Sequence, residues 1–156
     1  MSSDAAGLAQ ARSTHEYPSP PPSPQTAADP AATPTQAVQA FAVAYINWTA
    51  SSVAGDMGAL ARQSIGQARS AMQLAAAQTA GDYELQRGGI ANSGTVEAIA
   101  ALPGHPNEYV VVTRELTTAT NTTAYAGLAP AWHVAIATVA QQQVGGWALS
   151  AWQPES

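Results

Sequence analysis

The 156-residue chain contains no cysteine and no lysine. Without cysteine it forms no disulfide, no zinc–thiolate site and no thiol nucleophile. Its five basic residues are all arginine, and the ten acidic residues bring the formal net charge to −5. A nucleic-acid-binding protein normally carries a basic stripe, which this composition does not supply. We therefore expect no nucleic-acid partner.

Long apolar runs are also missing. The sequence has no stretch of about 18 apolar residues, the length that a membrane-spanning helix needs. The N-terminus lacks the basic and apolar segments of a secretory signal peptide. We therefore expect no membrane insertion by the chain as given. An anchor upstream of Met1 would place the domain outside the cytoplasm, and without one it would be cytoplasmic.

The N-terminal 34 residues are poor in large aliphatic side chains, with Leu8 as the exception. They hold seven of the eleven prolines, most of them in the run 18–24. Such a segment cannot bury enough apolar area to offset the entropy lost on ordering. We predict a disordered Pro-rich spacer over residues 1–34 and one folded domain over residues 35–156.

Helical periodicity begins directly after the spacer. A helix over residues 36–50, capped by Thr35, is predicted from apolar side chains at helical spacing: Val38, Phe41, Tyr45 and Trp48. A shorter helix is expected over 53–62. Ser64 is expected to cap a third helix that ends at Gly81.

Alternating patterns replace the helical ones after Gly81. They predict strands over 82–87, 95–102, 108–118, 132–140 and 147–152, with a hairpin loop over 103–107. Turns are expected at Gly88-Gly89, at Asn92-Ser93-Gly94 and at Gly145-Gly146. Helices followed by an antiparallel meander give an α+β fold, with the helices packed on one face of the sheet.

The apolar alternation also predicts which sheet face is buried. On the strand from Glu108, Val110, Val112 and Leu116 share a face with Arg114, which turns Glu115 outward. The centre of the core is then expected to comprise Val110, Val112, Trp132, Val134 and Ile136. His133 falls on the opposite face.

The element order resembles the NTF2-like, or cystatin-like, cone over residues 35–153. The resemblance is carried by the first-helix phrase AVQAFAVAY (37–45), the strand phrase PAWHV (130–134) and the closing phrase GWALSAWQP (146–154). These phrases are similar to those of uncharacterised actinobacterial proteins of this superfold. The resemblance implies an accessory domain of a conjugation or secretion apparatus. It also implies self-association through the sheet.

Two groups of residues are candidates for function. Those expected to line a cavity or its rim are Tyr45, Trp48, Arg114 and Trp132. Those expected at an interface are Glu115, His133, Trp147 and Trp152. Trp147 and Trp152 are an odd number of residues apart, so strand alternation places them on opposite faces. One is then expected in the core and the other on the surface.

The seven acids after residue 34 give little support for a catalytic base. Enzymes of the resembled superfold use acids and tyrosines that project into the cone, where burial raises the pKa of a carboxyl group. Only Glu97 and Glu115 lie in the middle of predicted strands, since the other five acids are expected in caps, loops or at strand ends. Glu115 is expected to point outward, and Glu97 is ambiguous, so Glu97 is the one candidate for such a base. We expect no catalytic residue, metal site or cofactor.

Two functions remain open. The first is a non-catalytic interaction module on a Pro-rich spacer, which binds other protein subunits or forms a homodimer. The alternative is a small-molecule-binding protein or enzyme of isomerase or hydrolase type that uses the cone cavity. A closed cavity holding a carboxylate would favour the second.

Overall fold

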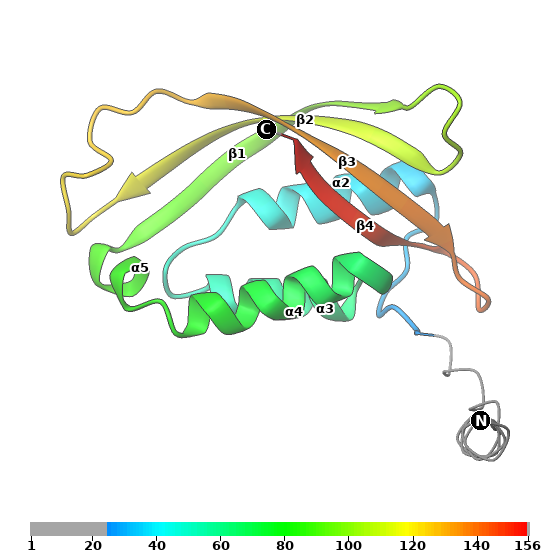
Figure 1. The fold of residues 1–156 in the computed structure, drawn as a ribbon, viewed down its shortest axis with the longest axis horizontal. Coiled ribbons are helices and arrows are strands. Elements are labelled where there is room, and N and C mark those ends of the chain that lie inside the picture. The colour runs from blue at the N-terminus through cyan, green and yellow to red at the C-terminus, as the bar shows by residue number, and fades with distance from the viewer. Residues whose placement is uncertain (1–24, 156) are drawn as a thin grey trace, which may run out of the picture.

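A computed structural model describes residues 25–155 of the chain. Helices come first and a four-stranded sheet follows, as the sequence predicts (Figure 1). The helices are α2 (Pro34–Ile46), α3 (Val53–Arg62), α4 (Gly66–Ala80) and α5 (Tyr83–Gly88). The strands are β1 (Ile90–Ala101), β2 (Glu108–Ala119), β3 (Ala131–Gln141) and β4 (Trp147–Glu155).

The N-cap of helix α2 lies two residues earlier than predicted. Thr33 is the N-cap, and its hydroxyl accepts a hydrogen bond from the Gln36 N–H at 3.1 Å, while Pro34 occupies the first turn, where a missing N–H costs nothing. The helix ends at Ile46, before the predicted end. Trp48 instead exchanges two backbone hydrogen bonds with Asn92 at the start of β1, both 3.0 Å long.

The two following helices form an antiparallel pair. The predicted bounds of α3 are confirmed, but Ser64 does not cap α4. Its hydroxyl donates to the Leu60 carbonyl at 2.6 Å, so it closes the end of α3 instead. Residues 82–87 were expected to form a strand and are helical. The Asp82 carboxylate caps α5 by accepting from the Leu85 N–H, and Gly89 ends it in the left-handed region at a φ of 61°.

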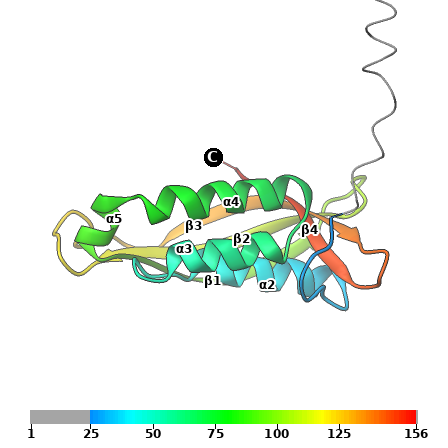
Figure 2. The same ribbon diagram turned by 90° about the horizontal axis from the view of Figure 1, so that it is seen from below.

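The sheet is an antiparallel meander in the order β1-β2-β3-β4, and all described helices lie against its concave face (Figures 1 and 2). β1 starts earlier than predicted, because Asn92-Ser93-Gly94 pairs with β2 instead of turning. Two irregularities interrupt the ladders. One lies at Glu97 in β1 and the other at Ser150 in β4.

The buried face of the sheet is the opposite of the predicted one. On β2 the buried side chains are Val111 and Thr113, and Arg114 is exposed. On β3 they are Ala135, Ala137 and Val139. The predicted core residues Val110, Val112, Trp132, Val134 and Ile136 therefore lie on the outer face. Three consecutive valines at 110–112 supply apolar side chains to both faces, so alternation could not distinguish them.

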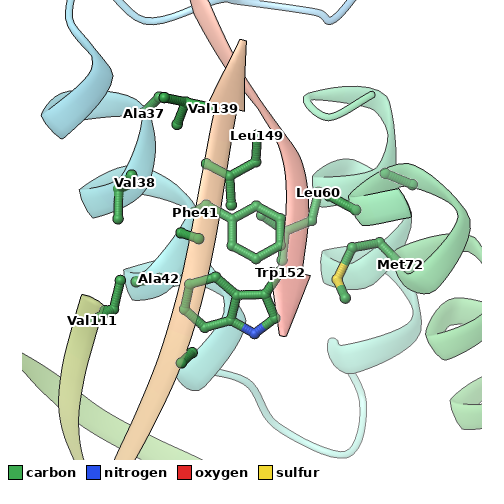
Figure 3. Close-up of a cluster of buried hydrophobic side chains, with 14 of the residues drawn as sticks. Ala37, Val38, Phe41, Ala42, Leu60, Met72, Val111, Val139, Leu149 and Trp152 are labelled. Atoms are coloured by element: carbon green, nitrogen blue, oxygen red, sulfur yellow. The ribbon is translucent and has the colours of Figure 1, made fainter. Parts of the chain in front are cut away.

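The concave face packs against α2, α3 and α4 to form one core. Figure 3 shows its centre, where Phe41 of α2 and Trp152 of β4 meet beside Leu149 and Met72. The ring centroids of Phe41 and Trp152 are 5.0 Å apart. Trp147 packs against the edge of the same core. The extra residue at Ser150 shifts the strand alternation by one position, so Trp147 and Trp152 both face inward. The prediction that they lie on opposite faces is therefore wrong.

The predicted boundary of the spacer is also too late. Residues 25–33 lie against the domain, and Ala27 is buried. The Ala28 N–H donates to the Arg62 carbonyl at 2.8 Å, and Ala31 forms an isolated antiparallel bridge with Trp147. Residues 25–33, which were assigned to the spacer, therefore pack as part of the folded domain. Residues 1–24, the rest of the predicted spacer, lie outside the described residues.

Alanine substitutions on β2 test which face is buried. Val111→Ala should lower the free energy of unfolding by about 2 kcal/mol, because it removes fully buried methyl groups and leaves a cavity. Val112→Ala, on the outer face of the same strand, should cost less than about 1 kcal/mol. Urea unfolding of the two variants measures both values. A larger loss for Val112→Ala would contradict the observed orientation of β2.

Candidate functional site

The outer face of the sheet has apolar side chains on its two central strands and carries no helix among the described residues (Figures 1 and 2). Trp132 is 62% exposed and Val134 is 38% exposed on β3. Half-buried apolar side chains surround them: Val110, Val112, Leu116 and Ile136. The register places Val112 beside Val134, and Val110 beside Ile136. We call these six residues the outer apolar patch. Single exposed apolar residues are ordinary, but a contiguous patch indicates a contact surface.

One cation borders this patch. The Arg114 guanidinium lies over the Trp132 ring, 5.8 Å from its centroid. Arg114 and Trp132 are register partners on β2 and β3. The stacked pair holds the exposed indole in place and covers part of it with a delocalised charge. Trp132 and Arg114, predicted to line a cavity or its rim, therefore lie together on the open outer face.

The concave face carries an aromatic cluster at its centre. Tyr45 stacks on Phe41 with ring centroids 6.0 Å apart, and it meets Trp152 at 5.2 Å. Tyr45 is half-buried, whereas Trp152 is only 4% exposed. Trp152 was predicted to be an interface residue and is a core residue instead.

Beside this cluster lies a carboxylate fixed by two donors. Glu115 points to the concave face, not outward as predicted, because β2 presents its odd-numbered residues to the core. One of its oxygens accepts from the Asn92 amide at 2.9 Å, and the other accepts from the Thr113 hydroxyl at 2.6 Å. Asn92 also donates to the Ile46 carbonyl at 2.7 Å. The carboxylate is therefore preorganised by the end of α2 and by two strands.

Gly94 makes room for this arrangement. It pairs with Glu115 across the sheet, and a Cβ at Gly94 would lie 2.9 Å from Glu115 Cγ and 2.7 Å from the Arg114 carbonyl oxygen. Any larger residue would displace the carboxylate. The sequence motif Asn92-Ser93-Gly94, predicted to be a turn, thus supplies both a donor and the space for Glu115.

One further polar group, the Tyr45 phenol, lies near the carboxylate, and the Trp152 N–H lies near the phenol. Burial raises the pKa of Tyr45 above its ordinary value of 10.0; the Trp152 N–H offsets part of this rise, and the nearby Glu115 carboxylate adds to it. The phenol is therefore a neutral donor at physiological pH. The Trp152 N–H acts on the phenol as a nearby donor, although within residues 25–155 it reaches no partner at full hydrogen-bonding geometry. A buried donor without a partner is destabilising and marks a place where water or a ligand atom can be accommodated.

The remaining predicted residues do not join this cluster as a set. His133 lies opposite Thr113 in the register but is exposed. Trp48 is half-buried and contacts β1 through its backbone. Glu97 sits at the β1 irregularity, where its carboxylate accepts from the Thr95 hydroxyl at 2.6 Å on the exposed outer side. The sequence therefore directed attention to Glu97, whereas the structure places Glu115 on the concave face.

No group of three or more metal-ligating side chains occurs within the part of the chain that the structure describes. Over the same residues no helix is long and apolar enough to cross a membrane.

The sequence did not reveal the roles of Asn92 and Gly94, because their motif was predicted to form a turn. The outer apolar patch escaped it because those residues were assigned to the core.

The link between Glu115 and Tyr45 can be tested by titration. Glu115→Gln removes a negative charge near the phenol, so the pKa of Tyr45 should fall toward its ordinary value. Glu97→Gln, on the outer side, should leave the Tyr45 pKa unchanged. Tyrosinate absorbance, with Tyr45→Phe identifying the signal, measures the shift. Equal shifts in the two variants would contradict the proposed proximity.

The same raised pKa predicts how stability depends on alkaline pH. The folded state holds the phenol protonated more tightly than the unfolded state does, so the stabilisation is complete below pH 10.0 and is lost as the pH rises through the folded pKa. Tyr45→Phe should reduce this alkaline loss in urea unfolding. A wild-type stability that rose above pH 10.0 would contradict it.

Comparison with known proteins adds evidence on the fold. No family model and no curated protein matches the amino-acid sequence. The solved structure of the VirB8 protein of Agrobacterium tumefaciens matches with a TM-score of 0.57 at 10% sequence identity. The match covers 78% of this chain and 90% of that one. At this identity the likeness concerns the fold alone. Together with the helices packed on a curved antiparallel sheet, it shows that the chain has an NTF2-like α+β fold.

Proposed function

We propose that this chain is a non-catalytic interaction module that assembles with protein partners through the outer apolar patch. The observation that carries the proposal is an apolar sheet face with Trp132 62% exposed at its centre. Aromatic and arginine side chains are enriched at the centres of protein interfaces, and Trp132 with Arg114 provides both.

We further propose that a second copy of the chain occupies this patch. The paired segment of β2 and β3 spans Glu108–Glu115, which is about 27 Å at the usual rise per strand residue, and four strands are about 19 Å wide. The whole sheet face is thus roughly 500 Å² on each copy, with the outer apolar patch on its two central strands, and two such faces together reach the lower limit of about 1,000 Å² for a specific interface. The homodimer should therefore be weak and depend on concentration.

Charges at the edge of the patch fit such a contact. Arg114 lies on β2 beside Trp132, while Glu155 on β4 is the register partner of Val134. A two-fold axis places the same surface of both copies face to face. Each Arg114 can then approach an acid of the other copy.

The proposal about the assembly in which the module works is based on the sequence phrases quoted above. Their resemblance to actinobacterial accessory domains leads us to propose a place in a conjugation or secretion apparatus. The NTF2-like fold is compatible with this proposal. The outer apolar patch would then contact other subunits of the apparatus where it does not contact a second copy.

Substitutions within the patch test self-association. Trp132→Ser and Val134→Glu should each shift the dimer toward monomer, raising the dissociation constant at least tenfold, because they remove apolar area or place a charge in the contact. Tyr83→Ser is the matched control, since Tyr83 is 70% exposed on α5, away from the patch. Sedimentation velocity over a concentration series measures the effect. A wild-type chain that stays monomeric at high concentration would refute the homodimer.

A second candidate function is binding of a small molecule on the concave face. The observation that favours it is the fixed Glu115 carboxylate, whose charge acts on the nearby Tyr45 phenol, because together they offer an acceptor and a neutral donor to one polar group. A small alcohol or ketone that raises the unfolding temperature of the wild type should lose this effect in Glu115→Gln and keep it in Glu97→Gln. Equal effects in all three proteins would argue against this function.

A further inference from the structure

A cavity of about 600 Å³ lies on the helical side of the molecule, between α3 and α4. Six residues of the two helices line it: Gly58, Ala61, Arg62, Arg69, Gln73 and Ala76. Residues 26–28 close one end. We call this cavity the Arg62–Arg69 groove. Because the helices lie on the concave face of the sheet, the groove is separate from the outer apolar patch (Figure 2).

The groove exists because small residues face each other across the helix pair. Gly58 and Ala61 on α3 lie opposite Ala76 on α4. A Cβ at Gly58 would meet only the Arg62 guanidinium, at 3.7 Å, so the space beside it is open. A larger side chain at this position would fill the groove without disturbing the backbone.

Arg69 is fixed in the wall of the groove by neutral acceptors. Its Nε–H donates to the Ser64 carbonyl at 2.8 Å and to the Ala61 carbonyl at 3.2 Å. Its Nη2 donates to the Thr26 carbonyl at 2.7 Å. A guanidinium has five N–H donors, so these contacts orient the group and leave further donors available. The half-buried charge is therefore preorganised.

Neither arginine of the groove has an anionic partner within the described residues. Within residues 25–155 the structure has an ion pair between His105 and Glu108, which do not line the groove. No acid lines the groove. In a chain with a net charge of −5, two guanidiniums without a carboxylate form a local positive site.

We propose that the Arg62–Arg69 groove binds an acidic segment of a partner protein. A carboxylate of that segment pairs with the guanidiniums of Arg62 and Arg69, for which carboxylates are geometrically matched ligands. The alanine and glycine walls receive the backbone and small apolar side chains on either side of the acid. Most of the lining is apolar, so a protein segment satisfies it better than a small inorganic anion does.

The test uses the full chain and a short labelled alanine-rich peptide with two glutamates, acetylated and amidated at its ends. A peptide with glutamine in place of glutamate is its neutral counterpart. Fluorescence anisotropy should show binding of the acidic peptide and at least tenfold weaker binding of the neutral one. Arg62→Gln should weaken acidic-peptide binding about tenfold.

Two variants separate the groove from general electrostatics. Gly58→Leu fills the groove with no change of charge and should abolish binding, and Ala76→Leu provides the same test from α4 if the first variant does not fold. Arg87→Gln removes an equal charge on α5, where Arg87 lies over Tyr83, and should leave the affinity within about twofold. Trp132→Ser should also leave it unchanged, which separates this proposal from the proposed assembly function.

Several results would overturn the proposal. Equal binding of both peptides would show that the carboxylate is not recognised. Equal weakening of acidic-peptide binding by Arg62→Gln and Arg87→Gln would show that the attraction is non-specific. Competition by acetate at the same carboxylate concentration would indicate a simple anion site. Loss of self-association in Gly58→Leu would assign the groove to a second copy. Absence of acidic-peptide binding to the full chain would refute the proposal outright.

Discussion

The contact of Trp152 with helix α2 holds the two layers of this fold together. Its indole packs against Phe41 (Figure 3) and against Tyr45. The ring centroids are 5.0 Å apart for Phe41 and 5.2 Å apart for Tyr45. Its backbone N–H donates to the Gln67 side chain on α4 at 2.8 Å. One residue near the C-terminus thus joins the first described helix, the last strand and α4. The curved sheet can close over the helices because this large side chain fills the space between them.

The sheet that results has an unusual division of polarity. Its concave face forms the apolar core and holds a hydrogen-bonded set of Asn92, Thr113, Glu115 and Thr117 at one end, while its outer face carries the outer apolar patch. The solvated face of an antiparallel sheet normally carries polar side chains, which this patch replaces. Every polar member of the concave set has a partner there, so its burial is tolerated. The apolar outer face has no such compensation in a single copy, which is why we place protein contacts on it.

The sequence predicted the layers of the fold better than the orientation of the strands. Strand positions were recoverable because β-branched runs and glycine turns mark them, as in Glu108–Ala119. The buried face was not, because Val110–Val112 is apolar on both sides and an interaction surface has the same signature as a core. The two tryptophans of β4 misled for another reason. One extra residue at Ser150 changes the parity of the strand, and no local pattern announces it.

The candidate site was predictable only in its residue types. Tyrosine, tryptophan and an acid were expected near the cone, but Glu97 was preferred over Glu115. The short helix α5 was predicted to be a strand, because Tyr83 and Leu85 alternate as strand residues do. The Asp82 cap and the left-handed conformation of Gly89 stabilise a helix instead. Local caps of this kind outweigh a two-residue alternation when the segment is only 6 residues long.

The way in which residues 25–31 enter the domain has a mechanical consequence. This segment is held by successive hydrogen bonds to Gly66, Arg69, Gln142 and Arg62, followed by the pairing of Ala31 with Trp147. A force pulling on the chain at Gln25 would reach these bonds one after another and peel the segment away, before it loaded the ladder between β3 and β4. The domain would then lengthen by a few residues under tension while its core stayed folded. Residues 25–31 would therefore act as an extensible connection between the domain and whatever its N-terminal segment is attached to.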